Sequence, residues 1–418
     1  MTRVTEKAIV ARITEHYLTS GDFNGYPLRQ LAIEFDIPRD QVLTTVTDLV
    51  RHGRVSVVTS HEENPYIKRF PGLPKEKQLE LLADSDLTHA CAYPSRSWLK
   101  RTVNPAKYKG RPFTLQLALG EPQLAYRVFD LSVLEFYRND PRYYYWNDDI
   151  SGGIHVRSEY GKQMPESDKI LLQTFGIAFD SNFNRAVAVF LRYLADLSPE
   201  HQRIWQAKAL RGKYKLHPDY FRSAILGQWH EGISIFDALL EEMHCINEMC
   251  GLIERPPLFR HVFREGAKPK GFGFLIRPTV KEFNDFIHLL DKILSENMNR
   301  DFFIGEVPKE SEHTRKDGRI EVRSKGTIQM LEEWLRLKYR TPDRRPIDEM
   351  IATFKRVRQM RQRPAHDVNE DVFDQKYLKE QREVIKRAYE AVQTLRFIFS
   401  ALRKNLEKCP IGGQLSVW

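Results

Sequence analysis

Apolar side chains recur every three or four residues from Pro278 towards the C-terminus, and this spacing constrains the last part of the chain to helices. Four apolar stripes mark the expected helices: Phe283–Leu294, Ile328–Leu337, Ile347–Val357 and Tyr377–Leu406. These spacings suit an antiparallel four-helix bundle, so we expect a C-terminal antiparallel helical bundle. The charged stretch Glu306–Lys325, between the first two helices, is expected to be a mobile, basic loop.

A second strong pattern lies near the N-terminus. Apolar stripes in residues 6–17, 28–35 and 38–52 predict three short helices, and alternating β-branched residues from Arg54 to Thr59 predict a strand after Gly53. With Leu-Ala-x-Glu-Phe-x-Ile across the turn and Leu-Val-x-x-Gly at the end, this arrangement resembles a winged helix-turn-helix domain over residues 1–70. Its wing is expected at Ser60–Arg69.

The resemblance implies that the third helix presents its outer face to the major groove of duplex DNA. The candidate DNA-binding residues on that face are Arg39, Gln41, Thr44 and Thr45. Asp40 and Asp48 share the face, and their charges repel phosphate. A winged helix that docks a protein or dimerises is therefore the alternative.

Residues 71–270 resemble no family and are expected to form a mixed α+β middle domain, with strands first and helices after. Strand composition marks Phe113–Leu119, Tyr126–Leu131 and Tyr143–Trp146, whereas residues 168–250 are mostly helical in pattern, with a helix start at Ser198-Pro199-Glu200. The run Tyr143-Tyr144-Tyr145-Trp146 could stack on unpaired bases, or it could alternate between core and surface as strand residues do. The whole chain is thus expected to be α+β and mostly α.

Motifs for metals and cofactors are weak. The chain has four cysteines, too few and too scattered for a disulfide framework. Cys245 and Cys250 with His244 do not have zinc-finger spacing, and a fourth ligand is not evident. Gly271-Phe272-Gly273 lacks the third glycine of a dinucleotide loop. We therefore expect no metal and no cofactor.

Positive charge is concentrated near the C-terminus. The net charge is +9, and Ser311–Lys408 alone holds 24 basic against 16 acidic residues. If the protein binds nucleic acid, this segment is the expected footprint. The N-terminus has no signal-peptide core, and no stretch approaches the roughly 18 apolar residues of a membrane span. A soluble, cytoplasmic protein without membrane contact is expected.

Inside the basic segment, Arg361-Gln362-Arg363-Pro364-Ala365-His366 lies between the third and fourth expected helices. An arginine supplies a fixed positive charge and a histidine titrates near neutrality, so the pair suits cleavage of a phosphodiester. The spacing Arg-x4–6-His is not distinctive in itself, because about three matches are expected by chance. Four occur: Arg54–His61, Arg211–His217, Arg255–His261 and Arg361–His366. The last is set apart by its place between two long helices.

At this junction, residues 271–418 resemble the HEPN superfamily, all-helical domains of which many are ribonucleases carrying Arg-x4–6-His. The resemblance implies metal-independent RNA cleavage to 2′,3′-cyclic phosphate ends, with Arg361 and His366 as catalytic residues. It also implies that Arg358 and Arg363 hold the RNA backbone, while Gln362 and Asp367 support the site. Pro364 departs from a helical register and is expected to end or kink the third helix.

The resemblance further implies a dimeric toxin or an antiviral effector of phage defence, because two HEPN protomers often bring their motifs together. The expected partners are RNA, duplex DNA through the winged helix, and a second copy or a larger complex. The alternative is a non-catalytic DNA-binding regulator or adaptor whose helical bundle mediates dimerisation. In that case Arg361 and His366 are simply favoured by the dipole at a helix end.

Overall fold

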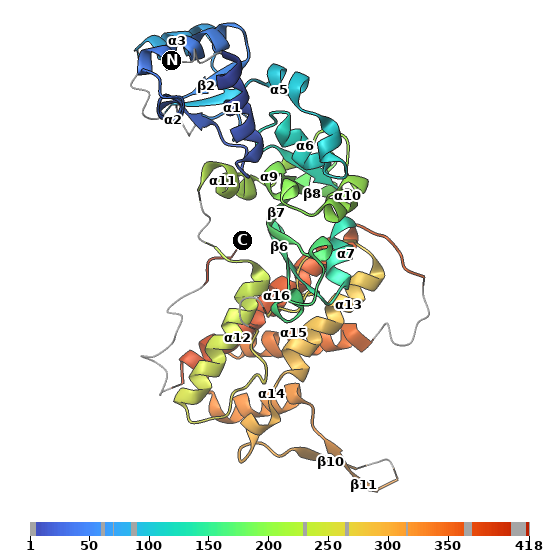
Figure 1. The fold of residues 1–418 in the computed structure, drawn as a ribbon. Helices are drawn as coiled ribbons and strands as arrows, with labels where there is room; N and C mark the ends of the chain where they lie inside the picture. Colours follow the sequence, from blue (N-terminus) through green and yellow to red (C-terminus); the bar gives the residue numbers. More distant parts are fainter. Residues whose placement is uncertain are drawn as a thin grey trace. The chain divides into compact units, whose positions relative to one another are not determined.

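The computed structural model describes residues 6–59, 63–69, 71–84, 90–228, 232–263, 267–314, 317–362, 370–402 and 415–417. The chain divides into two compact units, Met1–Val133 with Ile150–Gln228, and Leu134–Asp149 with Trp229–Trp418. Its elements are mixed α+β with more helix than strand, as the sequence predicts (Figure 1). The three domains predicted from the sequence, residues 1–70, 71–270 and 271–418, are a different division, and they stay a prediction.

The first unit opens with helices around a small antiparallel sheet. The helices are α1 (Glu6–Thr19), α2 (Leu28–Glu34), α3 (Arg39–Arg51) and α4 (Lys75–Asp84); the strands are β1 (Tyr26–Pro27), β2 (Val55–Val58) and β3 (Cys91–Pro94). The sheet order is β1-β3-β2. The apolar stripes predicted from the sequence do face this core, where Ile9, Val46 and Leu49 are fully buried.

The connection between β2 and β3 is longer than a simple wing. Residues 63–69, the described part of the stretch expected to be a wing, form turns. Helix α4 follows and packs against α3 and β2. The Gln78 side chain accepts a hydrogen bond from the Val57 N–H at 2.9 Å, and Leu82 joins the core. A helix is therefore inserted between the last two strands of the sheet.

The rest of the first unit is a larger antiparallel sheet with short helices. Its strands β4 (Tyr126–Phe129), β6 (Ser151–Val156), β7 (Leu171–Phe179) and β8 (Arg185–Phe190) follow the order β4-β8-β7-β6, and β9 (Lys215–Leu216) pairs with β7. The helices are α5 (Arg96–Thr102), α6 (Pro112–Ala118), α8 (Ser158–Gly161), α9 (Leu191–Ala195), α10 (Pro199–Ala207) and α11 (Pro218–Leu226).

Two predictions for this region are wrong. Phe113–Leu119 is not a strand, because Phe113 and Leu117 are buried one helical turn apart in α6, which begins at Pro112. Residues 168–250 are not mostly helical, since β7 and β8 supply two strands of the larger sheet, so strands and helices interleave. The expected helix start at Ser198 is confirmed: its hydroxyl oxygen accepts a hydrogen bond from the His201 N–H in α10.

The second unit consists largely of helices that share one core. They are α7 (Val133–Asn139), α12 (Ile235–Leu252), α13 (Val280–Asp291), α14 (Thr327–Lys338), α15 (Arg345–Gln362) and α16 (Lys376–Ser400). The four helices expected after Pro278 are α13 to α16, and α12 packs along α16 in the same core. The unit also contains strand β5 (Tyr143–Asn147) and a π-helical turn at Lys292–Glu296.

The stretch Glu306–Lys325 was expected to be a loop, but most of it forms a hairpin. Strands β10 (Glu310–Thr314) and β11 (Ile320–Ser324) pair antiparallel, with Thr314 opposite Ile320 and Glu312 opposite Val322. Ile320, Val322 and Ser324 alternate along β11 and share one face, but the charged residues between them made this strand pattern hard to recognise in the sequence. Within the described residues, no helix has the length and apolar character needed to cross a membrane.

Candidate functional site

The candidate site lies where α15 ends and the chain leads to α16. Arg358, Arg361 and Gln362 belong to the last turns of α15. Arg363, Pro364, His366 and Asp367 lie outside the described residues, so the effect of Pro364 on the helix stays a prediction. The structure therefore places the arginine of the Arg-x4-His pattern and leaves the position of its histidine open.

Arg361 is held by two carboxylates from another part of the unit. Its Nη1 donates to Asp291 Oδ2 at 2.8 Å and to Glu296 Oε1. The hydrogen bond with Asp291, followed by the one with Glu296, raises the pKa of the Arg361 guanidinium. The charge that the sequence assigns to a substrate phosphate is thus already balanced.

Asp291 accounts for this arrangement, because it is a fully buried carboxylate at the last residue of α13. Arg358 Nε lies 3.5 Å from Asp291 Oδ1, so two arginines of α15 compensate one buried charge. A buried carboxylate without such compensation is strongly destabilising. In the described conformation, Arg358 and Arg361 thus both have a structural role in joining α13 to α15.

The π-helical turn explains how Glu296 comes to lie beside Asp291. Its backbone bonds join residues five apart, which is the separation of Asp291 and Glu296. Neither carboxylate is predicted from the sequence. A signal existed for Asp291, which lies four residues after Ile287 on the apolar stripe of α13, where a charged residue demands a partner. We find no sequence signal for the π-helical turn.

A groove runs between α15 and α16, which pack against each other. One hollow has a volume of about 660 Å³. It is lined by Thr353, Arg356, Val357, Gln359 and Met360 of α15 and by Glu380, Glu383, Val384 and Arg387 of α16. A second hollow of about 440 Å³ continues towards Pro346 and Thr394, so the two helices run antiparallel. The two hollows share Thr353, Arg356 and Arg387.

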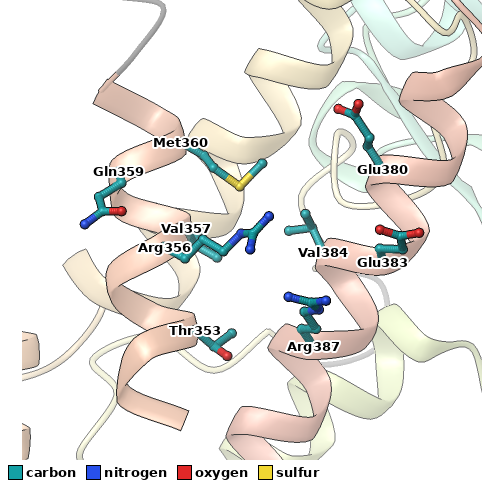
Figure 2. A pocket seen from close by; sticks show the side chains of 9 residues that line it. All are labelled: Thr353, Arg356, Val357, Gln359, Met360, Glu380, Glu383, Val384 and Arg387. Carbon is teal, nitrogen blue, oxygen red and sulfur yellow. The ribbon is translucent and has the colours of Figure 1, made fainter. Parts of the chain in front are cut away.

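Two arginines of this groove form no ion pair with any residue that the structure describes. Among the described basic residues of α15 and α16, only Arg356, Lys379 and Arg387 lack an ion-pair partner; Arg345, Lys355, Arg358, Arg361, Lys376, Arg382, Lys386 and Arg396 all have one. Figure 2 shows Arg356 and Arg387 reaching from opposite helices into the space between them. Neither arginine is predicted from the sequence as a site residue.

The walls of the larger hollow have two further kinds of side chain. Val357, Met360 and Val384 are apolar and partly or fully buried. Glu380 and Glu383 line the α16 side, and neither has an ion-pair partner in the described part of the chain (Figure 2). The groove thus combines two cations, two anions and an apolar floor, all close in sequence to the segment that carries His366.

The candidate DNA-binding residues are placed together on α3. Arg39, Gln41 and Thr44 are exposed, and Thr45 is half-buried. The hydroxyls of Thr44 and Thr45 donate to the carbonyl oxygens of Asp40 and Gln41, both at 2.8 Å, so their hydrogens already have partners. The acidic residue Asp48 pairs with Arg51 at 3.0 Å.

The aromatic run of the middle region is not a stacking surface. Tyr143, Tyr144 and Tyr145 are at most 6% exposed, so their rings are not accessible to bases. The expected alternation is wrong too, because three consecutive side chains are buried. Gly273 has a packing role: a Cβ there would meet the backbone carbonyl oxygen of Asn147 at 2.6 Å.

The cysteines next to His244 are buried thiols. Burial raises the pKa of both Cys245 and Cys250 to about 12. Where the structure describes the chain, no group of three or more His, Cys, Asp or Glu could hold a metal ion. The chain matches no protein-family model, no curated protein and no solved structure.

Proposed function

We propose that the protein is a metal-independent endoribonuclease that cleaves RNA through Arg361 and His366, as a dimer serving as a toxin or phage-defence effector. The 2′-oxygen of a ribose attacks the adjacent phosphorus while the bond to the 5′-oxygen breaks. His366 takes the proton from the 2′-hydroxyl or gives one to the leaving 5′-oxygen. The products are a 2′,3′-cyclic phosphate and a free 5′-hydroxyl.

The observation that carries the proposal is the groove between α15 and α16, which holds Arg356 and Arg387, two arginines without an ion-pair partner among the described residues. Unpaired guanidinium groups suit phosphate, which they can bind with two parallel hydrogen bonds. The sequence assigns Arg358 to the RNA backbone, but its side chain faces Asp291 instead. We assign backbone binding to Arg356 and Arg387, with Arg363 as a further candidate.

Arg361 needs a change of partner to act on a phosphoryl group. Of its two carboxylate partners, Asp291 is fully buried whereas Glu296 is 40% exposed. An exposed carboxylate is easier to displace, because water can solvate it once it leaves. In the proposed reaction the substrate phosphate replaces Glu296 while Asp291 keeps the guanidinium in position.

The test uses labelled single-stranded RNA in the presence of a metal chelator. The wild type should cleave it and leave cyclic phosphate ends, and His366→Ala should lose roughly 10²–10⁴-fold in rate. His261→Ala is the matched control, because His261 belongs to one of the chance Arg-x4–6-His matches, and it should retain full activity. No cleavage by the wild type at any protein concentration, or equal cleavage by His366→Ala, would refute the proposal.

The pairing of Arg361 with Asp291 and Glu296 favours one alternative, a non-catalytic regulator or adaptor in which the helices mediate dimerisation. In that case Arg361→Ala lowers the stability of the protein without any effect on RNA cleavage, because the only role of Arg361 is to compensate the buried carboxylate of Asp291. The same cleavage assay separates the two functions.

For the N-terminal residues we propose a winged-helix domain, supported by the helices α1 to α3 and the sheet order β1-β3-β2. Duplex DNA would contact Arg39, Gln41, Thr44 and Thr45. Arg39→Glu should then weaken binding of duplex DNA at low salt, measured by fluorescence anisotropy. No measurable binding by the wild type would leave protein docking as the role of this domain.

A further inference from the structure

We propose that the groove between α15 and α16 is a guanine-selective dinucleotide site, with a phosphodiester at Arg356 and Arg387 and a guanine base beside Glu380 and Glu383. This inference rests on the proposed function, because it takes RNA as the ligand. It adds residues and a base preference that the Arg-x4-His pattern does not supply.

The phosphate position follows from the charges. Arg356 and Arg387 extend from facing helices into one space, although like charges repel and neither has a carboxylate partner in the described residues (Figure 2). The basic residues next to them in the sequence do have carboxylate partners: Lys355 pairs with Glu332, and Lys386 pairs with Glu390. Two unpaired guanidinium groups facing one space are best satisfied by a single anion that both can bind.

The number of nucleotides follows from the shape of the groove. Arg356 and Arg387 line both hollows, so an anion at the arginines has a hollow on each side. Their volumes of about 660 and 440 Å³ are within the usual range of small-ligand sites. A phosphodiester joins two nucleosides, and each hollow can take one of them.

The base preference follows from the larger hollow. Val357, Met360 and Val384 provide an apolar surface against which a base can lie. Glu380 and Glu383 provide acceptors only, because an ionised carboxylate donates no hydrogen bond. Guanine presents two adjacent N–H donors on its Watson–Crick edge, which one carboxylate can accept together. Adenine, cytosine and uracil do not offer such a pair of donors.

The test measures binding of 2′-deoxy dinucleotides to the full chain by isothermal titration calorimetry. These probes lack the 2′-hydroxyl that the proposed cleavage uses, so they bind without turnover. GpG should bind at least tenfold more tightly than ApA or CpC. The double variant Arg356→Ala with Arg387→Ala should lose at least tenfold in affinity for all three. Glu380→Gln with Glu383→Gln should lose the preference for GpG and keep the affinity for ApA.

Lys379→Ala is the matched control, because Lys379 is the third cation of these helices that has no ion-pair partner in the described part of the chain. It does not line the groove, so the binding of this variant should equal that of the wild type. All the substituted residues except Glu380 are exposed, and unchanged thermal midpoints would verify that the variants fold. Equal affinity for GpG and ApA, or an arginine variant that binds as well as the wild type, overturns the inference. So does arginine-dependent binding of a glutamate-rich peptide in place of GpG.

Failure of the inference and failure of the nuclease proposal give different results. If RNA is cleaved in a His366-dependent manner while GpG and ApA bind equally, the guanine site is wrong and the nuclease stands. If GpG binds selectively while RNA is not cleaved, the groove is a nucleotide site in a non-catalytic protein.

Discussion

Glu242 of α12 and Arg396 of α16 form an ion pair in the core, with side chains 0% and 1% exposed. Glu242→Ala removes the carboxylate that compensates this buried guanidinium, and such losses cost about 3–5 kcal/mol. We expect that decrease in the free energy of unfolding, measured by urea denaturation. Glu241→Ala removes an exposed carboxylate next to it and should change stability by less than about 0.5 kcal/mol. Similar losses for both variants would contradict a dominant role for the buried pair.

Cys245 and Cys250 should be unreactive in the folded protein. Burial raises the pKa of both thiols to about 12, so they stay protonated at neutral pH, and the thiolate is the reactive form. Iodoacetamide at pH 8 followed by peptide mass spectrometry should label neither cysteine until denaturant is added. Labelling of the native chain as fast as of the denatured chain would show that these thiols are accessible.

For single residues, the sequence predicts burial better than it predicts the partners of charged side chains. Ile9, Val46 and Phe283 were expected on apolar faces and are buried. Arg361 was expected to face a substrate, but its observed partners, Asp291 and Glu296, are 70 and 65 residues earlier in the chain. Periodicity reports a side chain's face on its own helix, whereas an ion pair depends on the packing of two helices.

The connection between α12 and α13 depends on close packing at Gly273. A methyl group there would meet the backbone of Asn147 in strand β5, and backbone cannot move aside as a side chain can. Gly273→Ala should therefore lower the thermal midpoint by several degrees, equivalent to about 1–3 kcal/mol. Gly251→Ala in α12 is the control, because a Cβ there meets nothing within 4 Å. Since alanine favours helix over glycine, this control should be neutral or stabilising.

Elements with one clear periodicity were predicted well, and short elements with mixed signals were not. The apolar stripes of α13 to α16 are long enough to identify a helix. α6 is a single short helix of seven residues, in which strand-forming composition outweighed the spacing of Phe113 and Leu117. The hairpin β10–β11 was missed because four of its ten strand residues are charged and two, Ile320 and Val322, are apolar. The pairing of the two segments, not their composition, makes them strands.

For the whole molecule, the core of the second unit begins earlier than the predicted boundary at residue 271. α12 contributes Phe236, Leu239 and Met243 to the core that α13 to α16 share. A fragment of residues 271–418 would expose the face of α16 that α12 covers. We expect it to aggregate or to unfold without cooperativity, whereas residues 229–418 should show more helix by circular dichroism and a cooperative transition. Equal behaviour of the two fragments would show that α12 is dispensable.

Residues 134–149 belong to the second unit although the segments before and after them belong to the first, and this has a consequence for synthesis on the ribosome. The Asn147 side chain donates to the carbonyl oxygen of Phe274, which is 127 residues later in the chain. At the usual 5–20 residues per second, this partner is translated roughly 6–25 s after Asn147. During that interval Tyr143, Tyr144 and Tyr145 emerge without the second unit. The nascent chain therefore presents an aromatic segment that a chaperone can bind and that the finished protein buries.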